Sequence, residues 1–153
     1  MTNNWKENLA SFFEGYRIIE RSKDDTLKNF YQFCEFVAEP AFESLQEELK
    51  KYRVPSKIKK SKGRAITFQI NFPNSRIENF LYSIRFPRNS IELMLKLNIR
   101  GRSSKKSTLE EREHPFMKDI VPMEVLKIKI EDLIQDVIEH YRNFCFESAT
   151  KIE

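Results

Sequence analysis

Glycine, cysteine and long apolar runs are scarce in this sequence, and each scarcity argues against a class of protein. Three glycines, Gly15, Gly63 and Gly101, are scattered over 153 residues, so no glycine-rich loop is present to cradle a phosphate group. We therefore expect no nucleotide cofactor. No apolar run approaches the roughly 18 residues that span a bilayer, and the N-terminus lacks the basic and apolar segments of a secretory signal. A cytoplasmic protein without a membrane segment is the resulting expectation.

Cysteine and histidine are too few to indicate a metal centre or a disulfide framework. Cys34 and Cys145 are far apart in sequence, and both lie in helical patterns where a thiol usually serves as a small buried apolar group. His140 follows Asp136 by one helical turn, which permits a surface hydrogen bond, and His114 stands in an acidic segment before a proline. We assign no metal site, no catalytic residue and no enzymatic activity from these residues.

The composition that remains is typical of one folded domain. Hydrophobic residues make up 40% of the chain and charged residues 33%, and thirteen phenylalanines supply bulky side chains for a core. A chain of this length can bury about 68–70% of the surface that its unfolded form exposes. We therefore treat 1–153 as a single domain.

Apolar residues at spacings of three and four predict helices at both ends of the chain. The first helix is expected over about 4–21. A second is expected over 24–52, with Asp-Asp-Thr as its N-cap, and Pro40 should kink or divide it near Val37 because proline removes a backbone donor. A last helix is expected over about 123–147.

Alternation of apolar and polar residues predicts strands between the helices. Three strands are expected over 64–72, 80–86 and 91–100, and a weaker edge strand over 54–60. The polar segment 101–122 is expected to form a long loop, which is either functional or simply loose.

This order of elements predicts an α+β fold of two layers. Short turns favour an antiparallel sheet of three to four strands, packed on one face by the two N-terminal helices and the C-terminal helix. Strict alternation makes that face apolar and leaves the other face to meet solvent or a partner.

Positive charge is concentrated in the predicted sheet. Residues 51–118 hold 17 basic and five acidic side chains, whereas the helical segments on either side are acidic. Eight of the fifteen residues in 50–64 are basic, and a second cluster follows at 100–106. The candidate binding residues are Lys57, Lys59, Lys60, Lys62, Arg64, Arg100 and Arg102.

Three functions are compatible with this pattern. The leading hypothesis is a non-enzymatic binding or adaptor domain that presents a basic surface to an acidic protein partner, and the alternative is a nucleic-acid-binding protein. A hydrolase or ligand carrier with a site near 101–118 is the third, and it should show a pocket lined by His114 or by carboxylates with displaced pKa values. Trp5, Phe36 and Phe42 lie beside the main helical stripes, so a homodimer is a further hypothesis.

Overall fold

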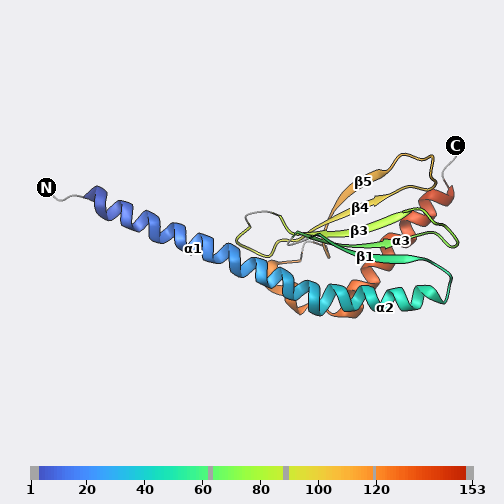
Figure 1. Ribbon diagram of the computed structural model, residues 1–153, viewed down its shortest axis with the longest axis horizontal. Coiled ribbons are helices and arrows are strands. Elements are labelled where there is room, and N and C mark those ends of the chain that lie inside the picture. The colour runs from blue at the N-terminus through green and yellow to red at the C-terminus, as the bar shows by residue number, and fades with distance from the viewer. Residues whose placement is uncertain (1–3, 62–63, 88–89, 119, 151–153) are drawn as a thin grey trace.

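The fold is a five-stranded sheet packed against helices, with one long helix that extends away from them (Figure 1). The computed structural model describes residues 4–61, 64–87, 90–118 and 120–150. The elements, in chain order, are α1 (Asn4–Phe33), a π-helical turn (Cys34–Ala38), α2 (Glu39–Lys50), β1 (Ser56–Ser61), β2 (Ala65–Ile70), β3 (Phe80–Arg85), β4 (Lys96–Gly101), β5 (Glu110–Pro115), a 3-10 helix (Pro122–Lys127) and α3 (Ile130–Thr150).

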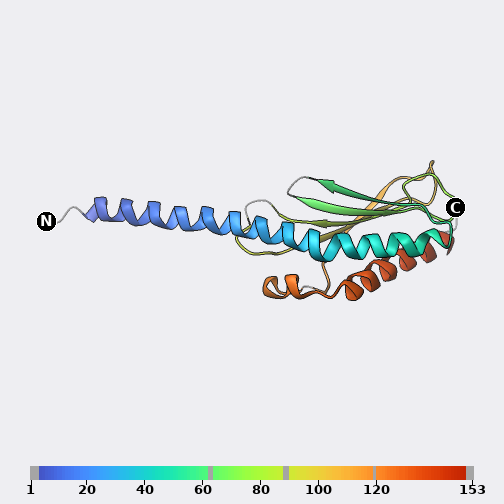
Figure 2. The ribbon, with the colours of Figure 1, turned by 60° about the horizontal axis from the view of Figure 1, so that its bottom comes forward.

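The α+β prediction is confirmed, with one strand more than expected. All five strands are antiparallel neighbours in the order β1-β2-β3-β4-β5. Figure 2 shows α2 and α3 side by side on one face of this sheet, and no described helix covers the opposite face. No described helix is both long and apolar enough to cross a membrane.

Large aromatic side chains fill the space between the sheet and the helices. The ring of Phe42 on α2 stacks on Phe68 of β2 with centroids 5.0 Å apart, and Phe80 of β3 meets Tyr141 of α3 edge-on at 5.4 Å. The helix-facing side chains of the central strands have almost no contact with solvent: Ile66, Phe68, Ile70, Phe80, Tyr82, Ile84 and Leu97. Burial of each such side chain stabilises the folded state by about 1.5–3 kcal/mol.

The expected break between two N-terminal helices at residues 22–24 is wrong, because α1 continues to Phe33. Its Asp-Asp-Thr sequence caps nothing. Thr26 is instead buried inside the helix, where its hydroxyl lies 2.7 Å from the carbonyl oxygen of Ser22 and 3.0 Å from that of Ile91. Residues that suit an N-cap are tolerated within a helix when their side chains find such acceptors.

The predicted interruption before Pro40 is confirmed, and it takes the form of a π-helical turn. In this turn the amide of Glu39 donates to the carbonyl oxygen of Cys34, five residues back. Proline has no amide and its ring clashes with the carbonyl four residues earlier. The wider turn accommodates both constraints, and the chain continues as α2.

The strand predicted over 91–100 is shorter than expected. Regular pairing begins only at Lys96, opposite Arg85. Because β3 ends at Arg85, residues 91–95 have no strand residue to pair with. In this upstream segment Leu93 is buried in the core while Ile91 is 56% exposed.

The long loop predicted over 101–122 is also wrong in part. Glu110–Pro115 pairs with β4 along its whole length as β5, although its first five residues are all charged or polar. Main-chain hydrogen bonds hold this edge strand, and its charged side chains discourage pairing with other chains. The last helix starts at Ile130 rather than near Met123, since a 3-10 helix occupies Pro122–Lys127.

Candidate functional site on the open face of the sheet

The face of the sheet opposite the helices is built from three rows of side chains that cross the strands. Antiparallel partners point to the same face, so the pairing register defines each row. The rows are Lys57, Gln69, Leu81, Arg100 and Glu111; Lys59, Thr67, Ser83, Asn98 and Glu113; and Ser61, Ala65, Arg85, Lys96 and Pro115. We refer to these fifteen residues as the open face.

The centre of the open face is polar and yet buried. Ser83 and Asn98 are 1% and 2% exposed, and Thr67 is nearly as inaccessible. The Thr67 and Ser83 hydroxyls lie 2.8 Å apart across the β2–β3 pair, and the amide of Asn98 donates to Glu111 at 2.7 Å. Because no described helix covers this face, the longer side chains around these three residues must exclude the solvent.

A hollow of about 440 Å³ opens above the two hydroxyls. Four basic side chains line it, Arg64, Arg85, Lys96 and Arg100, together with one carboxylate, Glu113. None of the four cations forms an ion pair with another described residue. The hollow therefore combines an excess of positive charge with hydroxyl groups at its base.

Two of these cations are placed directly opposite each other. Arg85 at the end of β3 pairs with Lys96 at the start of β4, on the same face. Like charges at directly opposed positions destabilise a sheet, by up to about 1 kcal/mol. A negatively charged group between Arg85 and Lys96 would turn this repulsion into attraction.

Buried hydrogen-bonding atoms without partners surround the same area. Among the described residues, the amide oxygens of Gln69 and Asn98 and the Nε atoms of Arg100 and Arg102 make no hydrogen bond. A buried polar atom without a hydrogen-bond partner lowers the free energy of unfolding by about 1–3 kcal/mol. These four atoms are buried, so a ligand could reach them only if the side chains above them moved.

The structure separates the seven cations predicted to form the binding site. Lys57, Lys59 and Arg100 lie on the open face and Arg64 lines its hollow, as described above. Lys60 points to the other face, where its ammonium pairs with Glu39 of α2 and this hydrogen bond raises the pKa of Lys60. Lys62 lies outside the described residues.

Lys59 and Arg102 gather around an acidic residue at the edge of the open face. The Lys59 ammonium donates to Glu78 at 3.0 Å and holds the pKa of Glu78 below its usual value. The guanidinium groups of Arg102 and Arg100 lower the same pKa further. Glu78 thus neutralises part of the predicted cluster. Of the seven predicted cations, Arg64 and Arg100 line the hollow and form no ion pair with another described residue.

Arg85 and Lys96 are not among the seven candidate binding residues named from the sequence, although both line the hollow. Their alternation with Ile84 and Leu97 places each on the polar face of its own strand. Only the register between β3 and β4 brings them together, and ten residues separate these strands in sequence. No local sequence signal reveals that register.

A second hollow, of about 290 Å³, lies on the helix side between β5 and α3. It is lined by both histidines and by carboxylates from each element, Glu110 and Glu147. The rings of His114 and His140 are 5.1 Å apart. This is the kind of pocket expected of the hydrolase or carrier hypothesis.

A buried hydrogen-bond network lies behind the two imidazoles. The hydroxyl of Tyr82 donates to Asp136 at 2.5 Å, and the other neighbour of Asp136 is His140, with a nitrogen–oxygen distance of 3.7 Å. Burial raises the pKa of Tyr82 well above its usual value, and Asp136 acts in the same direction. Burial lowers the pKa of His140, and His114 adds to this effect while Asp136 opposes it. The His140 imidazole is therefore held mainly neutral at pH 7.

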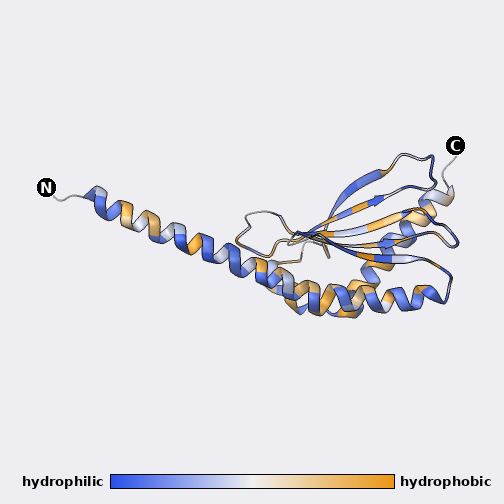
Figure 3. Cartoon of the chain, in the orientation of Figure 1, coloured by the Kyte–Doolittle hydropathy of each residue, from blue (hydrophilic) through white to orange (hydrophobic). Residues whose placement is uncertain are grey.

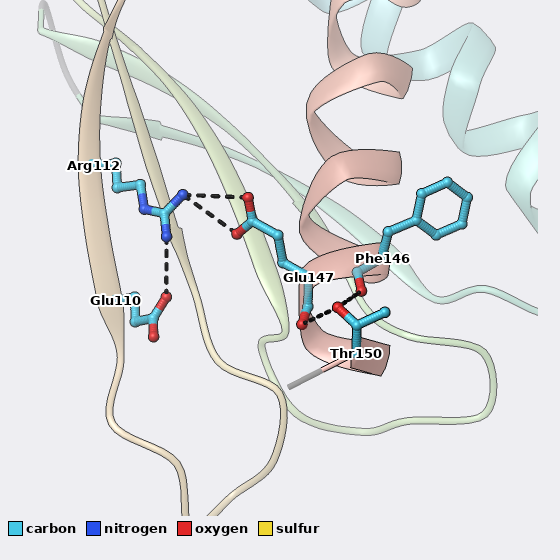
Figure 4. A network of polar contacts seen from close by, with 5 residues as sticks. All are labelled: Glu110, Arg112, Phe146, Glu147 and Thr150. Atoms are coloured by element: carbon cyan, nitrogen blue, oxygen red, sulfur yellow. Dashed lines mark hydrogen bonds and ion pairs between the residues drawn. The ribbon is translucent and has the colours of Figure 1, made fainter. Parts of the chain in front are cut away.

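Figure 4 shows the ion pairs among Glu110, Arg112 and Glu147, three of the residues that line this second hollow. The guanidinium group of Arg112 on β5 lies 3.3 Å from Glu147 of α3 and 3.9 Å from Glu110. The hydroxyl of Thr150 contacts the carbonyl oxygens of Phe146 and Glu147 at 2.9 and 3.3 Å. Of these contacts, the exposed Arg112–Glu147 pair ties β5 to the end of α3, and it contributes at most about 1 kcal/mol to stability.

Both cysteines are free and half-buried. Burial, with a smaller effect of the Glu39 charge, raises the pKa of the Cys34 thiol to about 12. Burial also raises the pKa of Cys145. Within the part of the chain that the structure describes, no group of three or more histidine, cysteine or acidic side chains is arranged to hold a metal ion.

Comparisons of the chain with protein-family models, with curated proteins and with solved structures gave no match.

Proposed function

We propose that this chain is a non-enzymatic binding module that receives an acidic peptide segment of a partner protein on its open face. The observation that carries this proposal is the opposed pair Arg85 and Lys96, which has no counter-ion among the described residues and flanks a hollow with the Thr67 and Ser83 hydroxyls at its base. A carboxylate placed there would neutralise two cations and accept a hydrogen bond from whichever of the two hydroxyls does not donate to the other.

The mixture of side chains on the open face favours a peptide over a nucleic acid as the ligand. A peptide supplies acceptors for the cations Arg85, Lys96 and Arg100 and also backbone N–H donors for the carboxylates Glu111 and Glu113. Single-stranded nucleic acid is usually held by stacking of its bases on aromatic rings, and the fifteen open-face residues include no aromatic side chain. Phe86 also lines the hollow, but its ring is buried and stacks on Phe30 with centroids 5.3 Å apart.

A direct test measures binding of a fluorescein-labelled oligoglutamate peptide by anisotropy at low salt. The variant R85S/K96S removes the opposed pair, and K105S/K106S is the matched control because it removes two exposed lysines from the turn after β4. We expect R85S/K96S to weaken binding by about tenfold or more, which corresponds to the loss of about 1.4 kcal/mol or more. The control should change affinity by less than about threefold.

Stability supplies an independent check on the same variants. Because R85S/K96S removes a like-charge pair, it should unfold at the same or a higher denaturant concentration than the wild type. Equal weakening by R85S/K96S and K105S/K106S would contradict the proposal, since binding would then follow net charge alone. A duplex DNA probe that binds tighter than oligoglutamate and depends on Arg85 and Lys96 would support nucleic-acid binding instead.

A hydrolase or ligand carrier is the second candidate, and the hollow between β5 and α3 is the observation that favours it. His140 is held neutral beside His114, which suits a general base. The described residues that line this hollow include no serine, threonine or cysteine, so no hydroxyl or thiol nucleophile lies there. Hydrolysis of 4-nitrophenyl acetate that is lost in H140Q would support an enzyme, and a rate equal to that of buffer would argue against one.

A further inference from the structure

The N-terminal half of α1 carries an apolar stripe that no other described part of the chain covers. Figures 1 and 3 show this half extending away from the sheet and its helices, with apolar bands along its length. The stripe consists of Trp5, Leu9, Phe12, Phe13, Tyr16 and Ile19, which are 46–63% exposed. The ring of Phe12 lies 5.2 Å from that of Phe13 and 6.3 Å from that of Tyr16. Four aromatic rings per chain are a large apolar surface to leave in water.

The stripe is one half of a regular seam whose other half is already buried. Alternating steps of four and three residues lead from Trp5 to Val37 through Leu9, Phe12, Tyr16, Ile19, Lys23, Thr26, Phe30 and Phe33. The last four apolar or hydroxyl positions, Thr26, Phe30, Phe33 and Val37, are buried by the rest of the fold. Such a repeat of 3.5 residues is the seam of a coiled coil, with Leu9 and Tyr16 at positions a and Phe12 and Ile19 at positions d. The exposed half therefore has the pattern of a helix that packs on another helix.

We propose that this stripe pairs with the same stripe of a second copy of the chain, as an antiparallel coiled coil of two α1 helices. In an antiparallel pair, a positions of one helix face d positions of the other. With the twofold axis near residue 14, Phe12 meets Tyr16 of the second copy, and Leu9 meets Ile19 of the second copy. Phe13 of each copy then lies at the axis, beside its equivalent.

Charge favours this antiparallel alignment over a parallel one. Lys6 and Glu20 both occupy position e, and antiparallel helices bring their e positions together. The axis that aligns the apolar layers also places Lys6 of each copy opposite Glu20 of the other. Lys6 has no ion pair among the described residues, and Glu20 has only an exposed contact with Lys23 at 3.4 Å. A parallel pair would place Glu20 opposite Gly15 and would form no such ion pair.

The size and position of the stripe also suit a dimer. The overlap covers about residues 4–24, or roughly 31 Å of helix, and ends where Thr26 enters the core, so the two folded bodies lie at opposite ends. The two copies together contribute eight half-exposed rings of about 200 Å² each, so that their pairing would bury roughly 800 Å² of aromatic surface. Leu9 and Ile19 raise the buried area past the ~1,000 Å² of a specific interface.

A membrane surface is a less suitable partner for the same stripe. Helices that bind anionic membranes carry an excess of lysine and arginine on the polar face. Residues 4–24 contain four basic and four acidic side chains, so their net charge is zero. A second copy, which offers both charges, is the better complement.

Sedimentation of the full chain between about 1 and 100 µM tests the proposal, which does not depend on the function of the open face. We expect the mass of the wild type to reach twice 18.4 kDa. K6E and E20K should each raise the dissociation constant about tenfold or more, because each creates two like-charge contacts. The doubly exchanged K6E/E20K should recover the wild-type value within about threefold. K28E is the matched control, since Lys28 is exposed on α1 beyond the overlap.

Disulfide formation distinguishes the two alignments. G15C should crosslink two copies through the twofold axis. L9C should not, because the axis places the two Leu9 residues about 15 Å apart along the helices, whereas a parallel pair would bring these two a positions together. A monomeric wild type, or a K6E/E20K variant that stays as weak as K6E, would overturn the proposal. So would crosslinking by L9C, or a monomer that binds vesicles containing phosphatidylserine through α1. Since these side chains contact no other part of the described fold, all variants should keep the near-ultraviolet circular dichroism of the folded body.

Discussion

Tyr82 and Asp136 connect the two layers of the fold, because the hydroxyl at the centre of β3 donates to the α3 carboxylate at 2.5 Å. Removing only the hydroxyl, in Y82F, leaves the carboxylate without its strongest partner in a buried site. We expect Y82F to lower the free energy of unfolding by about 1–3 kcal/mol, measured by urea denaturation. Y52F is the matched control, since Tyr52 is 71% exposed, and it should change stability by less than about 0.5 kcal/mol. Equal midpoints for Y82F and Y52F would contradict the assigned role.

The stability of the protein should fall as the pH drops through the range in which His140 titrates. Burial and His114 lower the pKa of folded His140 below the usual 6.5, although Asp136 and Glu139 oppose the shift. The unfolded chain therefore binds its proton more readily. The contribution of neutral His140 to the free energy of unfolding is complete above pH 6.5. It is lost as the pH falls through the lowered pKa that His140 has in the folded protein. Urea midpoints at pH 7.5 and 5.5 should differ more in the wild type than in H140Q, and parallel profiles would disprove this explanation.

The Cys34 thiol should be almost inert in the folded protein. With a pKa of about 12, it is nearly fully protonated at pH 8, and the thiolate is the form that reacts. In a C145S background, alkylation by iodoacetamide at pH 8 should be at least about a hundredfold slower in native protein than in urea. Mass spectrometry measures both rates. Similar native and denatured rates would show that Cys34 is not shielded at the π-helical turn.

Gly101 at the end of β4 should not tolerate a side chain. A Cβ atom there would lie 2.4 Å from the ring of Phe144 and 2.6 Å from the carbonyl oxygen of Asn79. G101A should therefore destabilise the protein by about 1–3 kcal/mol, measured by thermal or urea unfolding. G15A is the matched control because nothing lies within 4 Å of a Cβ at Gly15, and alanine there should favour α1 by about 0.5–1 kcal/mol. Losses of similar size in both variants would contradict the packing argument.

The sequence predicts those elements whose side chains alone decide their structure. Alternation from Ile66 to Ile70 and from Phe80 to Ile84 locates β2 and β3 because one face of each must be buried. The interruption before Pro40 follows from the missing amide of one residue. The layer order and the fold class then follow from the order of these elements.

Other features depend on neighbours that are distant in sequence. The polar strand β5 exists because β4 offers a free edge, so its own residues give no apolar signal. Thr26 is helical because a carbonyl from residue 91 accepts its hydroxyl. The opposed pair Arg85 and Lys96 requires the register of β3 on β4. The basic character of the site could therefore be predicted, whereas its arrangement and the pairing of Lys60 with Glu39 could not.

The measurement that tests the central claim most directly is a titration of ¹⁵N-labelled protein with the oligoglutamate peptide, followed by backbone and side-chain amide resonances. We expect the largest changes at Thr67, Ser83 and Asn98 and at the Asn98 side-chain amide, with smaller changes at Arg85 and Lys96. R85S/K96S should abolish these changes at the same peptide concentration. Changes confined to α1 or to the hollow between β5 and α3, with none on the open face, would contradict the account.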